Sequence, residues 1–251
     1  MLMIMIIRGH IATVKAYFGK PCLTWDSFSN FSDVSPFIMT HLKQVYLSLF
    51  LILLSSVLGS VWHFFTKNGG LTNVIGFMGF LIWYNHIQPW RGRKRVSLLM
   101  AAAFCKGVFL EFLLGPFIHD NKGIIITLLG GSALAFGCFA VVARRYERER
   151  DYTYSYGVLY AIIIVSIWLF SGSYMYGGKD AYTLYFFVPF VGLSYLLSYT
   201  VLYSQEIVEQ TRRDDHHYSE HCVMFFTYIP ALSWWFVSNL LKELHTFITN
   251  I

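Results

Sequence analysis

Two ionisable side chains inside one apolar segment are the first residues of this sequence whose types could do chemistry. Lys106 and Glu111 both lie between residues 96 and 118, where most neighbours are apolar. A charge at membrane depth is costly, so such residues usually face a wet cavity or partner and mark paths for ions or protons. The competing interpretation places one of them near an interface, where its side chain extends to water. Five residues turn a helix by about 140°, which predicts different partners for the two.

A second cluster of ionisable residues lies further along the chain, in residues 214–221. It comprises Asp214, Asp215, His216, His217, Glu220 and His221. A helix would place His217 and His221 on one face, but zinc needs further ligands in tetrahedral geometry, and no H-E-x-x-H pattern is present. We favour a solvated loop over a metal site or a histidine pH sensor, and we expect no metal and no cofactor.

The usual signatures of catalysis are missing from the sequence. It contains no phosphate-binding G-x-x-x-x-G-K pattern, no G-x-S-x-G and no dense histidine box. Its four cysteines form no C-x-x-C pair, which indicates free thiols. We therefore expect that the protein is not an enzyme.

The composition of the chain indicates the class of protein whose structure must position these residues. The chain has 251 residues, of which 56% are hydrophobic and only 13% charged. A soluble domain carries about 25% charged residues, so this chain cannot cover a globular surface with polar groups. This excludes an ordinary soluble enzyme and a nucleic-acid reader, and it indicates a membrane protein whose first partner is the lipid bilayer.

Seven windows are long and apolar enough to cross a bilayer as helices, which need about 20 residues. Because the windows are continuously apolar, we predict an all-α polytopic bundle of about seven transmembrane spans and no barrel. Residues 1–43 form a cytosolic N-terminal segment, 44–241 the bundle and 242–251 a short tail. The windows are Gln44–Phe65, Leu71–Pro89, Val96–Ile118, Gly123–Ala143, Gly157–Met175, Tyr182–Ser204 and Cys222–Leu241.

Basic residues predict the orientation of these spans. Lysines and arginines gather before the first span and in the second, fourth and sixth connections, which places the N-terminus in the cytosol. With seven spans the C-terminus then faces the lumen, whereas a re-entrant last span would return it to the cytosol. The sequon at Asn30 is expected to be cytosolic and unmodified. Small residues such as Ala101–Ala103 and Gly130–Ala133 predict close packing between helices.

Several short motifs carry a resemblance to the Bax inhibitor-1 family. The most specific is His41-Leu42-Lys43-Gln44-Val45-Tyr46, just before the first span. The resemblance covers roughly residues 24–241, in order. Its other elements are Trp25, Phe28, Asn30, Phe31, Ser35, Pro36, Lys94–Ala101, Phe136–Phe139, Ala143-Arg144-Arg145 and His221-Cys222.

The resemblance implies a bundle of six helices around a central seventh, in the endoplasmic reticulum membrane. It also implies suppression of cell death, interaction with Bcl-2-type proteins and a pH-sensitive calcium leak. In the family the leak is tied to aspartates on the last two helices that share protons, and neighbouring carboxylates couple in this way.

This sequence departs from the family at those aspartates. The family's Asp-Thr-Gln falls on Tyr203-Ser204-Gln205, and the last-helix aspartates fall on Met224 and Tyr228. A tyrosine ordinarily titrates near 10, far above cytosolic pH. Glu209 still matches a family glutamate, and Glu111 or Glu206 is a partial substitute. The third-helix motif is rearranged too, with Glu111 preceding Gly115-Pro116.

We therefore expect a negative regulator of apoptosis and of endoplasmic reticulum stress signalling that acts through partners in the membrane. The alternative is a calcium leak channel with altered or lost pH gating. The residues of its polar path are Lys106, Glu111, Tyr203, Glu206, Glu209 and Tyr228. Partners under these hypotheses are Bcl-2-type membrane proteins and calcium ions, with no nucleic acid.

Overall fold

The computed structural model describes residues 35–67, 70–114, 123–146, 150–176, 186–212 and 217–226. These residues form a helical bundle without strands, so the predicted all-α class is confirmed. A further helical segment covers residues 218–226. The long helices are α3 (Pro36–Thr66), α4 (Leu71–His86), α5 (Gly92–Leu114), α6 (Ile124–Arg145), α7 (Arg150–Tyr176) and α8 (Val188–Arg212).

Several helices extend beyond the apolar windows because polar residues continue the same backbone hydrogen bonding. Helix α3 begins at Pro36, where a missing amide hydrogen costs nothing, and ends at Thr66, after which Lys67 adopts the left-handed conformation. Helix α8 continues past Ser204 to Arg212. Hydropathy identifies the apolar part of a helix, whereas its ends depend on capping and packing.

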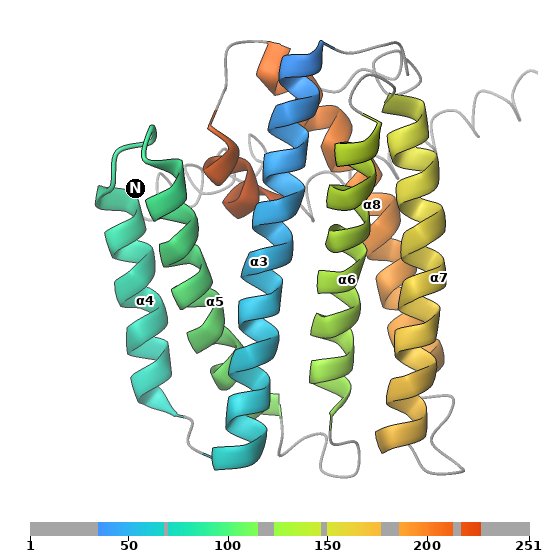
Figure 1. The fold of residues 1–251 in the computed structure, drawn as a ribbon. Coiled ribbons are helices and arrows are strands. Elements are labelled where there is room, and N and C mark those ends of the chain that lie inside the picture. The colour runs from blue at the N-terminus through green and yellow to red at the C-terminus, as the bar shows by residue number, and fades with distance from the viewer. Residues whose placement is uncertain are drawn as a thin grey trace, which may run out of the picture.

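The helices run alternately up and down, which gathers the basic residues at one end (Figure 1). Arg93, Lys94 and Arg95 lie in the first turn of α5, and Arg144 and Arg145 lie in the last turn of α6. The upper end in Figure 1, where α3 and α5 begin and α6 and α8 finish, is therefore the basic end. This is the arrangement that the positive-inside rule associates with the cytosolic side.

Helices α3 and α5 pack at very short range through two glycines. A Cβ atom at Gly59 would overlap the Phe104 carbonyl oxygen, and one at Gly107 would overlap the Ser56 carbonyl oxygen. The Ser60 hydroxyl donates to the Gly107 carbonyl across this contact at 3.1 Å. Small residues and serine hydroxyls are how helices associate in lipid, where the hydrophobic effect does not drive them together.

The small residues singled out in the sequence also lie at helix contacts. Ala102 and Ala103 are buried, and a Cβ atom at Gly130 would overlap the Trp168 ring. These observations agree with the packing role that their sizes predict.

Four of the described helices are long and apolar enough to cross a membrane: Pro36–Thr66, Gly92–Leu113, Ile124–Arg145 and Asp151–Met175. Helix α4 has 16 residues, short of a full crossing. The helix of the sixth window is shifted toward the chain's C-terminus, where it takes in Glu206 and Glu209. Most of the seventh window lies outside the described residues.

The start of the last window occupies the interior of the bundle. Its helix begins at Tyr218, ahead of the predicted Cys222, and its residues contact α3, α4, α5, α6 and α8. A helix that touches five others agrees, over the described residues, with a central position for the seventh helix.

Candidate functional site

A buried polar cluster surrounds the beginning of the last helix, near the basic end. Its members come from α3, α4, α5, α8 and the segment 218–226. We refer to it as the polar cluster, and it comprises His41, Tyr46, Tyr84, Arg95, Tyr203, Ser204, Glu206, Ser219, Glu220 and His221, all buried except the half-buried Glu220.

The motif His41–Tyr46 supplies the α3 side of the polar cluster. The His41 ring meets the His221 ring edge-on, with centroids 5.1 Å apart. The Tyr46 hydroxyl and the Ser204 hydroxyl share a hydrogen bond of 2.5 Å, and Ser204 also donates to the Thr200 carbonyl. The Cys222 thiol donates to the Val45 carbonyl oxygen, with 3.9 Å between sulfur and oxygen. The turn of α3 that carries the most specific motif therefore packs against α8 and the last helix.

Arg95 connects the start of α5 to the last helix. Its guanidinium lies 2.7 Å from a Glu220 carboxylate oxygen and 4.2 Å from the centre of the Tyr84 ring. Tyr84 in turn donates from its hydroxyl to the Ser219 carbonyl at 3.1 Å. A buried guanidinium requires a compensating charge, and here a carboxylate and an aromatic face both provide one.

Tyr218 lies at the outer edge of the polar cluster, over the first turn of α5. A Cβ atom at Gly92 would overlap its phenol ring, so a larger residue there would require the ring to shift. Burial raises the pKa of the Tyr218 phenol, the Cys222 thiol adds to the rise, and Arg93 opposes it.

The expectation of a solvated loop over residues 214–221 is wrong for residues 218–221. Residues 218–221 are helical, His221 is fully buried, and Glu220 makes the ion pair with Arg95. A run of charged residues looks solvated when considered alone, but the side-chain partners of Glu220 and His221, which are Arg95 and His41, lie more than a hundred positions away in the sequence. Residues 214–216 lie outside the described part of the chain.

Tyr203 is the first of the sequence-predicted path residues in the polar cluster. It is 1% exposed, and its hydroxyl donates to the His221 carbonyl at 3.0 Å. Its ring stacks on Tyr199 and meets Phe225 edge-on at 5.2 Å. Tyr199 makes a parallel contact, donating to the Phe225 carbonyl. Two tyrosine hydroxyls thus fasten α8 to the last helix.

Glu206 and Glu209 follow on α8. Glu206 is 1% exposed, and the Gln210 amide donates to its Oε1 at 2.8 Å. Glu209 is only partly buried, and its carboxylate lies 4.0 Å from Arg212. The structure therefore brings Tyr203 and Glu206 together in the buried interior and leaves Glu209 nearer the surface.

Lys106 and Glu111 lie on α5, which packs chiefly on α3 and α4. Lys106 is exposed, and its ammonium nitrogen lies 5.7 Å from the centre of the Phe226 ring. Glu111 is near His63, and its Oε2 is buried without a hydrogen-bond partner among the described residues. The neighbours of the two side chains differ, as five-residue spacing predicts.

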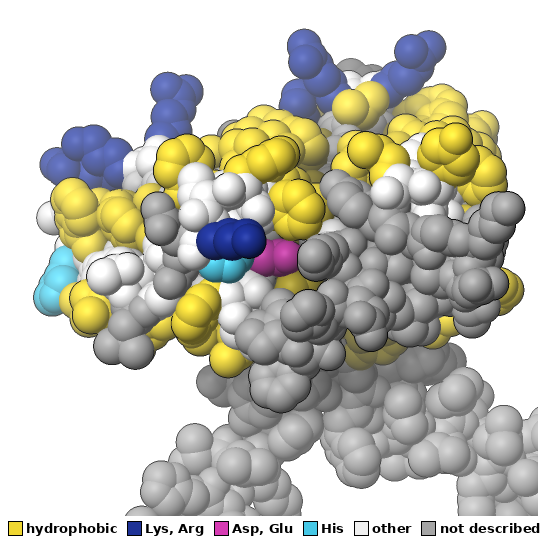
Figure 2. Space-filling view, turned by 90° about the horizontal axis from the view of Figure 1, so that it is seen from below, with side chains coloured by type: hydrophobic (Ala, Val, Ile, Leu, Met, Phe, Trp, Pro, Cys, Tyr) yellow, Lys and Arg dark blue, Asp and Glu magenta, His cyan; other side chains and the backbone are white. Residues whose placement is uncertain are grey.

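Figure 2 views the bundle from the end opposite the basic one. It shows an acidic side chain in the middle of that face, beside a histidine and a basic side chain. The described residues near the ends of α3 and α5 on this side include His63, Lys67 and Glu111.

The remaining residue of the hypothesised polar path, Tyr228, lies outside the described part of the chain.

The polar cluster joins the helices through hydrogen bonds and an ion pair, and it buries several titratable side chains. Over the described ranges, no set of three or more His, Cys, Asp or Glu is arranged to hold a metal. Sequence reasoning missed Arg95 and Tyr84 as site residues, and it interpreted Glu220 as part of a solvated loop. No local signal marks such a pair, although the family-like motifs include Arg95 and adjoin Glu220.

Comparisons with known proteins identify the same family that the short sequence motifs resemble. A family model described as inhibitor of apoptosis-promoting Bax1 matches residues 38–241. Bax inhibitor 1 of Arabidopsis thaliana is 34% identical over 214 residues, covering 85% of each chain. The protein of the same name from Oryza sativa subsp. japonica is 32% identical, covering 88% of each. That from Homo sapiens is 28% identical over 81% of this chain and 86% of its own. No solved structure matches significantly.

Proposed function

The chain belongs to the Bax inhibitor 1 family, and on this premise we propose that it suppresses apoptosis as a multi-pass protein of the endoplasmic reticulum membrane. The observation that carries the proposal is the family match over residues 38–241, which includes every element of the polar cluster. We extend the proposal to restraint of endoplasmic reticulum stress signalling and to a role without catalysis.

The proposed mechanism is interaction with membrane partners, Bcl-2-type proteins above all, more than ion flow. Its support is the contact between α8 and the last helix. There the Tyr203 hydroxyl donates to a backbone carbonyl, at a position where the family resemblance implies a proton-sharing carboxylate. A hydrogen bond between a phenol and a backbone carbonyl has no group of its own that titrates in mild acid, unlike a carboxylate pair.

The proposed orientation places the N-terminus in the cytosol. Support comes from the basic residues at the start of α5 and at the ends of α6 and α8, which share one end of the bundle. The polar cluster then lies near the cytosolic side, within reach of partners there.

A calcium leak is the second candidate function. The observation that favours it is Glu111, whose buried Oε2 has no hydrogen-bond partner among the described residues and which lies near His63. An oxygen with spare lone pairs at this end of the bundle is a suitable transient ligand for calcium. Glu206, which is buried, is a second carboxylate on the hypothesised path.

Expression in cells that lack their own Bax inhibitor 1 tests the two candidates together. After induction of Bax or addition of tunicamycin, we expect higher survival with no fall in stored calcium. Arg95→Glu, which places two carboxylates side by side, should abolish protection, whereas the exposed neighbour Lys94→Glu should retain it at equal expression. Failure of the unaltered protein to protect contradicts the proposal. Protection together with a calcium loss that Glu111→Gln prevents favours the leak.

A further inference from the structure

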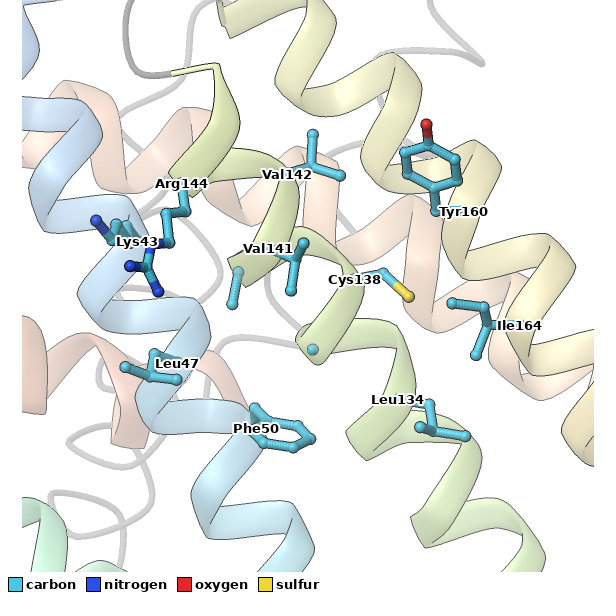
Figure 3. A pocket seen from close by; sticks show the side chains of 12 residues that line it. Lys43, Leu47, Phe50, Leu134, Cys138, Val141, Val142, Arg144, Tyr160 and Ile164 are labelled. Carbon is cyan, nitrogen blue, oxygen red and sulfur yellow. The ribbon is translucent and has the colours of Figure 1, made fainter.

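A groove on the outer surface of the bundle has the shape of a site for an elongated ligand. It lies between α3, α6 and α7 and has a volume of about 460 Å³ (Figure 3). Its walls are almost wholly apolar, with Phe50 on α3, Leu134 and Val141 on α6, and Ile164 on α7. Val141 is 69% exposed although it lies on a membrane-crossing helix, so this surface faces lipid.

The groove runs along the helix axes from the basic end toward the middle of the bundle. On α6 its lining extends from Arg144 to Leu134, which is about 15 Å at 1.5 Å per residue. One leaflet of a bilayer's hydrocarbon core is also about 15 Å thick. A ligand that fills the groove therefore spans one leaflet, with one end at the headgroup level.

The end of the groove at the headgroup level is positively charged. Lys43 on α3 and Arg144 on α6 both line it, and Figure 3 shows their side chains at the same end, beyond Leu47 and Val141. Basic residues near the cytosolic leaflet attract anionic headgroups. Tyr160 on α7 also lines the groove, and its ring combines an apolar body with a polar hydroxyl.

We propose that this groove is a binding site for one anionic phospholipid of the leaflet at the basic end. The phosphate lies between Lys43 and Arg144, and one acyl chain lies along Phe50, Val141 and Leu134. The charge pattern favours a lipid over a partner helix, because two basic side chains lie at one end of a lining that is otherwise almost wholly apolar. The site is separate from the polar cluster, and the proposal requires only that the bundle spans a membrane.

Native mass spectrometry of the detergent-solubilised full chain tests the site. The probes are phosphatidylserine and phosphatidylcholine with identical acyl chains, and glycerophosphoserine, which lacks the chains. We expect phosphatidylserine to bind on the order of ten-fold more tightly than phosphatidylcholine, because only its headgroup carries net negative charge. Glycerophosphoserine should not compete, since it cannot occupy the apolar part of the groove.

Matched variants test the residues. Lys43→Glu combined with Arg144→Glu should reduce phosphatidylserine binding to the phosphatidylcholine level. Arg145→Glu, an exposed neighbour outside the groove, should leave it unchanged. Val141→Trp should weaken both lipids by filling the groove, whereas Ile167→Trp, 62% exposed on α7 and outside the groove, should weaken neither.

Five outcomes would overturn the proposal, provided that thermal unfolding shows each variant folded. The first three concern direct binding of lipid. They are equal binding of the two lipids by the unaltered chain, equal effects of the Lys43→Glu/Arg144→Glu double variant and of Arg145→Glu, and unimpaired binding by Val141→Trp. Competition by glycerophosphoserine would also contradict it, because the site would then be one for soluble phosphate. Displacement of both lipids by a stoichiometric protein partner seated at Val141 would assign the groove to a protein instead.

Discussion

The Tyr203 hydroxyl on α8 donates a hydrogen bond of 3.0 Å to the carbonyl oxygen of His221 in the last helix. This contact joins the two helices that carry proton-sharing aspartates in the family resemblance. Around it, the Tyr46–Ser204 hydrogen bond and the Arg95–Glu220 ion pair tie α3 and α5 to the same region. The beginning of the last helix is thus fixed by neutral and ion-paired contacts from several directions, and the predictions below test that arrangement.

Removing the Tyr203 hydroxyl should weaken the bundle modestly. Tyr203→Phe keeps the ring against Tyr199 and Phe225 but loses one buried hydrogen bond, which is worth about 1 kcal/mol. Thermal unfolding in detergent measures the loss. Tyr174→Phe, at an 87% exposed position, serves as the control and should change nothing. Equal midpoints for all three proteins would show that the Tyr203 hydroxyl contributes no stability.

Removing Arg95 from its ion pair with Glu220 should lower the free energy of unfolding more than removing the Tyr203 hydroxyl does. Arg95→Ala leaves the Glu220 carboxylate, which is 29% exposed, without its partner and removes the contact over Tyr84. Loss of one partner of a buried pair costs about 3–5 kcal/mol, and the exposure of Glu220 reduces the expected loss to about 2 kcal/mol.

A double-mutant cycle with Glu220→Ala measures the coupling between the two residues. The double variant should be less destabilised than the sum of the single variants, since the pair is removed together. Lys94→Ala, exposed on the same turn, should have no effect. Simple additivity would mean that the two side chains do not interact in the folded protein.

Close packing between α3 and α5 should not tolerate a single added methyl group. At Gly107, a Cβ atom meets backbone rather than a side chain that can move, so Gly107→Ala must separate the helices. We expect a loss of several kcal/mol, or no folded protein, in a fluorescence size-exclusion assay. Gly79→Ala on α4 has open space within 4 Å and should behave as the unaltered chain does. A monodisperse Gly107→Ala protein of normal stability would contradict the short α3–α5 contact.

The proposed orientation predicts an accessible N-terminus. In sealed microsomes, added protease should remove an N-terminal tag, and glycosidase treatment should leave the mobility of the protein unchanged because Asn30 is not modified. A glycosidase-sensitive band lost on Asn30→Gln would place the N-terminus in the lumen and reverse the topology.

The sequence was sufficient for the class of the fold but not for the contacts at the site. Apolar windows predicted helices because length and hydropathy are local properties, and small residues predicted packing at Ala102 and Gly130. The apolar windows left Glu206 and His221 outside the helices, since the burial of these two residues depends on helices that are distant in the chain. Arg95 looked like a topology anchor because its partner is 125 positions away. Glycines 59 and 107 gave no signal, because a close approach becomes visible only when two helices are placed together.

The central claim is that this family member closes the contact between its last two helices without a proton-sharing carboxylate pair. Calcium efflux from proteoliposomes at neutral and mildly acid pH tests it most directly. Tyr203→Asp combined with Tyr228→Asp is the matched variant, because it places carboxylates at the positions where the family resemblance implies them. We predict no acid-stimulated efflux through the unaltered protein and acid-stimulated efflux through the double variant. Acid-stimulated efflux through the unaltered protein, lost on Glu111→Gln or Glu206→Gln, would contradict the claim and assign proton sensing to those glutamates.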